Sequence, residues 1–235
     1  MQWYGTILPR IKTHVPTKRI LEIACGYGRW TQYLKDLCEQ LTLVDLSEEC
    51  IHACQQRFSG SKNIAYHVND GKSLDMIDDN SIDFIFSYDS LVHANDVVIE
   101  TYLSQLRRIL SSDGACFIHH SNLGEYRTLY SRLRKVPKLE ETLVNLGVLD
   151  KTLHWRDANV DSSLVESLAK KYGLRCITQE ITQWGFSKAY TDCMSTIVRD
   201  DSPVIKENTI YRNSSFSQEI RNLSELTKLY GPAKM

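Results

Sequence analysis

Short apolar runs alternate with amphipathic stretches over roughly the first 120 residues of the chain. The apolar runs have strand length, whereas the stretches between them repeat apolar residues at helical spacing. The expected strands are residues 19–24, 41–45, 64–68, 82–87 and 115–120, and the expected helices are residues 29–38, 47–58 and 96–110. Strands that alternate with helices in this way predict a parallel, doubly wound α/β sheet.

The alternation breaks after residue 120. Residues 121–160 contain two helical stretches interrupted by Pro137, and we interpret this segment as a helical lid inserted after the fifth strand. Asp161 is expected to start a further helix. The strands expected at 174–181 and 190–199 have no helix between them, so the last of seven strands should be antiparallel.

The two ends of the chain carry weaker patterns. A short helix is expected within residues 1–17, and the polar tail, residues 200–235, holds one expected helix at 216–230. No internal repeat or linker divides the sequence. We therefore expect a single domain covering residues 1–235, since this length is ordinary for one hydrophobic core.

Composition narrows the class of protein. Hydrophobic residues make up 42% of the chain, charged residues 24%, and the formal net charge is −1. Near-zero charge disfavours a nucleic-acid partner, which usually requires a basic surface. No apolar run approaches the length of a membrane span, and the seven cysteines lack a Cys-x-x-Cys pair. We expect a cytoplasmic protein with reduced thiols and no membrane partner.

A glycine turn follows the first expected strand and carries the clearest chemical signal. Its sequence from Glu22 is Glu-Ile-Ala-Cys-Gly-Tyr-Gly, ending at Gly28. Glycines let a ligand approach the backbone, and the helix that follows offers free N–H groups. A turn of this kind after the first strand of a doubly wound sheet typically holds a small molecule.

Acidic residues stand at the ends of the next strands. Asp45 ends the second strand, at the distance from the glycine turn that suits a contact with both ribose hydroxyls, provided that both carboxylate oxygens are free. Asp70 follows the third strand and Asp89 the fourth. Because parallel strands end at one edge of a sheet, these acids should converge there.

At this point the sequence resembles the class I S-adenosyl-L-methionine (SAM)-dependent methyltransferases, strongly over residues 18–120. Their first motif is an acid followed by Gly-x-Gly-x-Gly, and here the first glycine is replaced by Ala24. The resemblance implies a Rossmann-like fold and SAM as the cofactor. It implies cofactor contacts from Glu22, Ala24, Gly26, Gly28, Asp45, Leu46, Asp70, Gly71 and Ser87, with Asp70 near the adenine.

Three histidines are the candidate general bases. His93 follows the fourth strand, and His119 and His120 end the fifth, next to the methyl donor in this fold. Histidine suits proton removal near neutral pH, and Asp89 would orient the imidazole or act as the base itself. We favour the strand-end pair over His93, because a strand holds a base more rigidly than a loop. A divalent metal bound by the same residues is the alternative, but metal-ligand spacing is absent, so no metal is expected.

The remaining candidates would bind the methyl acceptor. Basic residues of the expected lid favour an anionic group, and aromatic residues nearby would form a wall. The candidate acceptor-binding residues are Tyr88, Asn122, Arg127, His154 and Arg156.

The stretches around Asp89 and His119 resemble those of bacterial sugar and natural-product O-methyltransferases. The expected reaction is therefore methyl transfer to a hydroxyl of a small polar acceptor such as a sugar or glycan precursor. N-methylation of a small amine and a non-catalytic SAM-binding subunit are the alternatives. The sequence does not decide whether the protein forms a homodimer.

Overall fold

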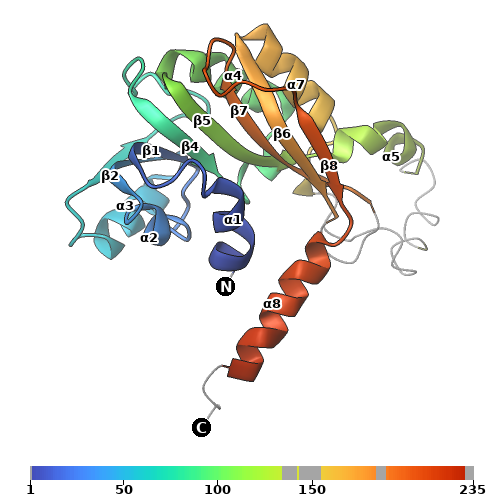
Figure 1. The fold of residues 1–235 in the computed structure, drawn as a ribbon, viewed down its shortest axis with the longest axis horizontal. Helices are drawn as coiled ribbons and strands as arrows, with labels where there is room; N and C mark the ends of the chain where they lie inside the picture. Colours follow the sequence, from blue (N-terminus) through green and yellow to red (C-terminus); the bar gives the residue numbers. More distant parts are fainter. Residues whose placement is uncertain (1, 134–141, 143–154, 184–188, 231–235) are drawn as a thin grey trace.

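A single sheet organises the computed structural model, which describes residues 2–133, 142, 155–183 and 189–230. Eight strands of these residues pair in the order β3-β2-β1-β4-β5-β7-β6-β8 (Figure 1). The strands are β1 (Thr17–Ile23), β2 (Cys38–Asp45), β3 (Ile64–Val68), β4 (Ile82–Ser87), β5 (Leu110–Ser121), β6 (Leu174–Thr182), β7 (Asp192–Arg199) and β8 (Thr209–Asn213). Only β7 runs antiparallel to its neighbours. The predicted Rossmann-like α/β class is confirmed.

Helices cover both faces of this sheet, as Figure 1 shows. One face packs against α4 and α7, and the other lies under the N-terminal segment together with α2 and α3. The helical elements are η1 (Trp3–Ile7), α1 (Leu8–Ile11), α2 (Thr31–Leu34), α3 (Glu48–Arg57), η2 (Leu91–His93), α4 (Asp96–Ile109), η3 (Leu123–Tyr126), α5 (Arg127–Leu133), α7 (Ser162–Lys171) and α8 (Phe216–Tyr230). None of the helices in the described residues is both long and apolar enough to span a membrane.

Local sequence explains where the longer helices begin. The side chain of Ser47 accepts a hydrogen bond from the backbone N–H of Cys50 and caps α3. Asp161 caps α7 in the same way through the N–H of Leu164, at 2.8 Å. Such caps satisfy backbone donors that have no partner inside the helix. Both starts were readable from the sequence for this reason.

Two element boundaries differ from the sequence prediction. The helix expected at 29–38 shortens to α2 because β2 already begins at Cys38. Residues 112–114, expected as a turn, lie inside β5, which begins at Leu110. Gly114 fits this strand because a side chain there would come within 3.0 Å of the backbone oxygen of Ile82 on β4.

The sheet contains one strand more than the seven that the sequence predicts. β8 lies in the polar tail and pairs in parallel with the outer side of β6. Its side chains are exposed except that of Asn213, so the strand lacks the apolar pattern that marks a buried one. Backbone pairing to β6, which sequence periodicity does not reveal, forms this strand.

The N-terminal segment and the final helix also pack on the described core. Trp3 of η1 is buried and stacks on Tyr33, with ring centroids 4.8 Å apart. Arg10 of α1 forms two hydrogen bonds of 2.6 Å to Glu180 on β6, which ties this segment across the sheet. The expected short N-terminal helix and the helix at 216–230 are both confirmed.

Candidate active site

The strand order reverses at β1, which lies between β2 and β4. In open α/β sheets, ligands bind beside the carboxyl ends of the strands at such a reversal. The carboxyl ends of β1, β2 and β4, together with the residues that directly follow them, contain most of the predicted cofactor-binding residues. Chain topology therefore brings these residues to one crevice.

The turn after β1 approaches a ligand through its backbone. Ala24, Gly26 and Gly28 all have positive φ, at 57°, 52° and 75°. Ala24 takes the strained conformation that the first glycine of the methyltransferase motif would adopt freely, at a cost of about 1–2 kcal/mol. A side-chain carbon at Gly26 would meet no atom within 4 Å, so this face of the turn is open.

Gly28 has a different role. A side-chain carbon at Gly28 would lie 2.5 Å from the ring of Phe58. The glycine therefore lets the turn pack against the residue that caps the C-terminal end of α3. Among the predicted cofactor-binding glycines, Gly26 is the one that faces open space in this part of the chain.

Asp45 holds the same turn in place. One of its carboxylate oxygens accepts the N–H of Gly26 at 2.8 Å, and the other accepts the N–H of Ser47 at 2.9 Å. The condition set for the ribose contact, that both carboxylate oxygens be free, is therefore not met. Each oxygen keeps a second lone pair, so the carboxylate can still accept hydroxyl donors.

Glu22 is buried beneath the turn. One of its oxygens accepts a hydrogen bond of 2.6 Å from the hydroxyl of Thr31, and Oε1 has no partner among the described residues. Burial raises the pKa of Glu22 to about 8, the Thr31 hydrogen bond opposes this shift, and the nearby Cys54 and Asp45 add to it. The carboxyl group is therefore poised to gain a donor or a positive charge.

The other predicted cofactor residues line the rim of the crevice. Leu46 is 68% exposed and lies against Gly71, an apolar surface suited to a flat ring. Ser87 is fully buried, and its hydroxyl has no partner in the described part of the chain. Asp70 is exposed, and one of its oxygens accepts the N–H groups of Lys72 and Ser73, so this acid closes its own turn.

The segment after β4 carries a half-buried acid, Asp89, and an exposed histidine, His93. Asp89 has a φ of 65°, an uncommon conformation for a residue other than glycine, and its carboxylate lies 3.4 Å from Arg29. His93 is exposed in η2, and its Nδ1 donates to the backbone oxygen of Trp155 at 2.6 Å. With the proton on Nδ1, the neutral imidazole leaves Nε2 as an acceptor.

The strand-end histidines are placed differently, and the preference for them is corrected. His119 is fully buried, and its Nδ1 accepts the N–H of Asp89 at 3.3 Å, so Nε2 carries the proton toward Asp192. His120 is also fully buried and bonds Ser121 and Ser195. Burial lowers the pKa of His120 to about 4. Neither ring offers an acceptor nitrogen to a substrate, whereas His93 does.

Asp192, which sequence analysis missed, lies at the centre of a buried network. Its carboxylate binds Arg156 through two hydrogen bonds, one of them 2.8 Å long, and lies 3.5 Å from His119 Nε2. Although burial alone would raise the pKa of Asp192, the hydrogen bonds from Arg156 and His119 hold it below its usual value. Antiparallel pairing of β7 with β5 brings Asp192 beside the end of β5.

This network joins both ends of the segment after β4. Asp89 contacts His119, which contacts Asp192, which binds Arg156; the residue next to Arg156, Trp155, accepts the hydrogen bond from His93. Arg156 is thus a buried structural cation, which corrects its prediction as an acceptor-binding residue. Finding this network from the sequence would have required the pairing register of β5 and β7, because no local motif contains it.

Asn122 is likewise corrected. It is fully buried, its amide nitrogen donates to Glu125 and to the backbone of Tyr190, and its oxygen accepts the N–H of Ser162. All of these bonds hold the chain after β5 to neighbouring segments.

The remaining acceptor-binding predictions have mixed outcomes. Tyr88 is buried and its ring stacks on His119 at 4.6 Å between centroids. Arg127 is exposed at the start of α5. His154 lies outside the described residues, as do the expected helix at 139–146 and most of the lid. Over the described ranges, His, Cys, Asp and Glu side chains form no group that could hold a metal ion.

Comparisons with known proteins find similarity to methyltransferases. Residues 20–114 match a family model described as a methyltransferase domain. A phosphoethanolamine N-methyltransferase of Triticum aestivum is 30% identical over 117 residues, which are 48% of this chain and 23% of that protein. The putative methyltransferase YqeM of Bacillus subtilis is 33% identical over 107 residues, covering 44% of this chain and 43% of that protein. The chain thus spans less than half the length of these curated relatives.

The fold is similar to that of solved methyltransferases. An S-adenosylmethionine-dependent methyltransferase from Clostridium acetobutylicum superimposes with a TM-score of 0.60 over 84% of this chain and 91% of that chain, at 13% sequence identity. Residues 20–114 thus match a methyltransferase domain, which agrees with the expected cofactor SAM, and the likeness to the solved structure shows the fold. They do not distinguish O-methylation from N-methylation.

The crevice fits this cofactor on its own structural evidence. The buried oxygen of Glu22 and the hydroxyl of Ser87 lack partners in the described residues, and the backbone at Gly26 faces open space. A ligand with an amine and hydroxyl donors would satisfy such groups, because an unpaired buried polar atom costs about 1–3 kcal/mol.

The raised pKa of Glu22 predicts a pH dependence of stability. Between its ordinary value of 4.5 and about 8, the ligand-free folded protein keeps a proton that the unfolded chain has released. The free energy of unfolding should therefore fall as pH rises through this window. Glu22→Gln should remove this part of the decline, as urea denaturation at pH 5, 7 and 9 would measure. The exposed Glu39→Gln is the control, and equal pH dependence of wild type and Glu22→Gln would contradict the buried, protonated carboxyl.

The buried pair of Asp192 and Arg156 predicts non-additive losses of stability. Asp192→Asn or Arg156→Gln alone should cost about 3–5 kcal/mol, because each leaves the other charge buried without its partner. The double variant should lose clearly less than the sum. Urea denaturation of the four proteins measures the coupling, with the exposed pair Glu125 and Arg212 as a control worth about 1 kcal/mol or less. Additive losses at Asp192 and Arg156 would show that the two charges are not coupled.

Proposed function

We propose that this protein is a SAM-dependent methyltransferase that acts on a small polar acceptor. One observation carries the proposal: the open backbone at Gly26 lies at the same sheet edge as a buried Glu22 oxygen without a described partner and an exposed histidine with an accepting nitrogen. The first two features suit a cofactor, and the third suits proton removal from an acceptor. The family match of residues 20–114 supports the same reaction.

Each part of the crevice has a defined task in cofactor binding. Asp45 would accept the ribose hydroxyls on its remaining lone pairs while it orients the Gly26 turn. Leu46 would cover the adenine, and Glu22 would interact with the amino group. When bound, SAM supplies a methyl group that a sulfonium makes electrophilic. The protein then needs only to align the acceptor and take its proton.

His93 is the base that the geometry supports best. The carbonyl of Trp155 holds the Nδ1 proton, so Nε2 points its lone pair away from this contact. The exposed Arg29 and the half-buried Asp89, which lie 3.4 Å apart, would position the acceptor through hydrogen bonds. His119 would act indirectly, because it binds the backbone of Asp89 and thus stabilises the strained residue.

A hydroxyl of a sugar, glycan precursor or natural product is our proposed acceptor, and a negative charge on it would suit the exposed cations Arg29 and Arg127. N-methylation of a small amine is the second candidate, favoured by the wheat relative, whose name specifies phosphoethanolamine. Both candidates place an anionic or strongly polar group near these arginines.

The cofactor assignment predicts that the isolated protein binds SAM and S-adenosylhomocysteine in calorimetry. Asp45→Ala should weaken both roughly ten- to hundredfold, because hydrogen bonds to charged groups contribute about 1.5–3 kcal/mol each. Asp36→Ala, which removes an exposed carboxylate after α2, should leave the affinity unchanged. Circular dichroism would verify that both variants fold. Binding of a nicotinamide dinucleotide in place of SAM would refute the assignment.

The base assignment predicts that His93→Ala lowers methyl transfer by about 10²–10⁴-fold while calorimetric SAM affinity is retained. Transfer of labelled methyl from SAM into small-molecule extract fractions provides the assay. The exposed His52→Ala on α3 is the matched control and should keep full turnover.

Two outcomes would contradict this base. Undiminished transfer by His93→Ala would show that another group takes the proton. Loss of activity in EDTA, restored by Mg²⁺, would indicate that a metal activates the acceptor instead.

A further inference from the structure

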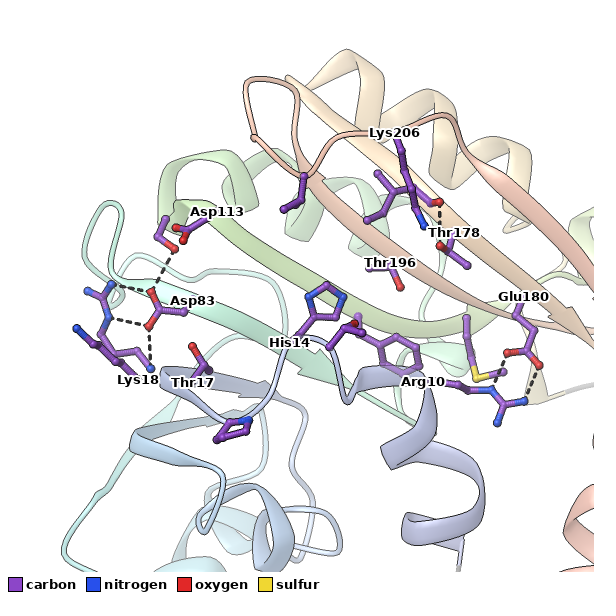
Figure 2. Close-up of a pocket in the computed structure, with 18 residues that line it drawn as sticks. Arg10, His14, Thr17, Lys18, Asp83, Asp113, Thr178, Glu180, Thr196 and Lys206 are labelled. Carbon is purple, nitrogen blue, oxygen red and sulfur yellow. Dashed lines mark hydrogen bonds and ion pairs between the residues drawn. The ribbon is translucent and has the colours of Figure 1, made fainter.

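A cavity of about 900 Å³ lies on the side of the sheet that carries α1, between the start of β1 and the strands β6 and β7 (Figure 2). Its volume falls within the range of small-molecule sites, about 300–1,000 Å³. Residues from α1 and the turn after it, from five strands and from the loop before β8 line it. None of the cofactor-crevice residues contributes to its wall.

One end of the cavity is distant from the cofactor crevice. It is lined by Thr17 at the start of β1 and by Asp113 near the start of β5, whereas the crevice lies beyond the carboxyl ends of the strands. β1 has 7 residues, and a strand rises about 3.3 Å per residue, so the two ends of β1 are roughly 20 Å apart. At its other end the cavity is lined by Met194, which pairs with His119 on β5.

The floor of the cavity is apolar. Phe117, Ile177 and Met194 line it and are each almost fully buried. The hydroxyl-bearing residues Thr178 and Thr196 lie among them. A flat hydrocarbon or aromatic ring would cover this surface and remove it from water, at about 25 cal/mol per Å² of apolar area.

Two ion pairs lie at the cavity wall, and within each pair the opposite charges neutralise each other. Arg10 binds Glu180 through two hydrogen bonds of 2.6 Å. Arg19 binds Asp83 through side-chain contacts of 2.9 and 3.3 Å. Figure 2 draws both pairs at opposite sides of the cavity. These four residues therefore leave no net charge for a ligand.

The remaining ionisable groups on the wall are mainly basic. Lys18, Lys206 and His14 have no ion-pair partner among the described residues. Of the acids that line the cavity, only Asp113 also has no such partner among the described residues. His14 stacks flat on Phe84, with ring centroids 5.6 Å apart. Burial lowers the pKa of His14, and the charge of Lys206 lowers it further. The ammonium group of Lys206 beside the His14 ring, whose N–H can donate a hydrogen bond, favours an anion at this part of the wall.

We infer that this cavity binds a small anion with a flat apolar body, such as an aryl phosphate, sulfate or carboxylate, independently of the cofactor crevice. The body would lie over Phe117 and Met194, and the anionic group would contact Lys206 and His14. Thr196 would donate a hydrogen bond from its hydroxyl to an anion oxygen, whereas the hydroxyl of Thr178 already donates to the backbone oxygen of Ile177 at 2.8 Å. This site does not depend on the proposed methyl transfer.

Calorimetric titration with phenyl phosphate tests the inference on the full chain. We expect saturable binding that is tighter than that of inorganic phosphate or of phenol alone, since each probe offers only one half of the interaction. Saturating S-adenosylhomocysteine should not displace phenyl phosphate. Displacement would place the probe in the cofactor crevice and refute a separate site.

Charge reversal tests the residues. Lys206→Glu should weaken phenyl phosphate about tenfold or more, whereas Lys170→Glu, an exposed lysine at the end of α7, should have no effect. His14→Phe keeps a ring for stacking on Phe84 and should weaken the phosphate but not phenol. Equal affinities for wild type, Lys206→Glu and His14→Phe, or no binding of phenyl phosphate at all, would overturn the inference.

Discussion

The position of β1 between β2 and β4 is the constraint on which the rest of the structure depends. Chains leaving β1 and β4 turn to opposite faces of the sheet, and the backbone between them opens at the turn around Gly26. Asp45 reaches this turn only because β2 pairs with β1 in parallel, so that both strands end at the same edge. The chemical groups of the crevice come from separate segments, and strand pairing alone assembles them.

The buried charges around Asp192 represent a cost that the fold compensates. Removing a carboxylate from water is expensive, and this one is offset by two bonds from Arg156 and by His119. In return, the network ties the last part of the expected lid segment to Asp89 and, through Trp155, to His93. A rigid support of this kind can hold the exposed base near the acceptor while the base itself remains accessible.

The two faces of the molecule offer different kinds of surface. At the carboxyl edge, unpaired polar atoms and an open backbone suit a cofactor with many donors. In the cavity near the other edge, excess basic charge surrounds an apolar floor. The Thr17 end of the cavity lies roughly 20 Å, the length of β1, from the carboxyl edge, so a ligand at that end need not interfere sterically with the crevice.

The sequence alone determined the features that depend on neighbouring residues. Strand and helix periodicity located most elements, and Ser47 and Asp161 marked helix starts because a cap bonds N–H groups within one turn. The glycine turn and its acids were recognisable for the same reason.

Only the tertiary structure decided which histidine is accessible. His119 is buried by Asp192, a residue 73 positions later in the numbering, whereas His93 stays exposed. Likewise, β8 exists through its pairing with β6, and the raised pKa of Glu22 through burial. Burial and pairing between distant segments depend on how the whole chain packs, so no local pattern contains them.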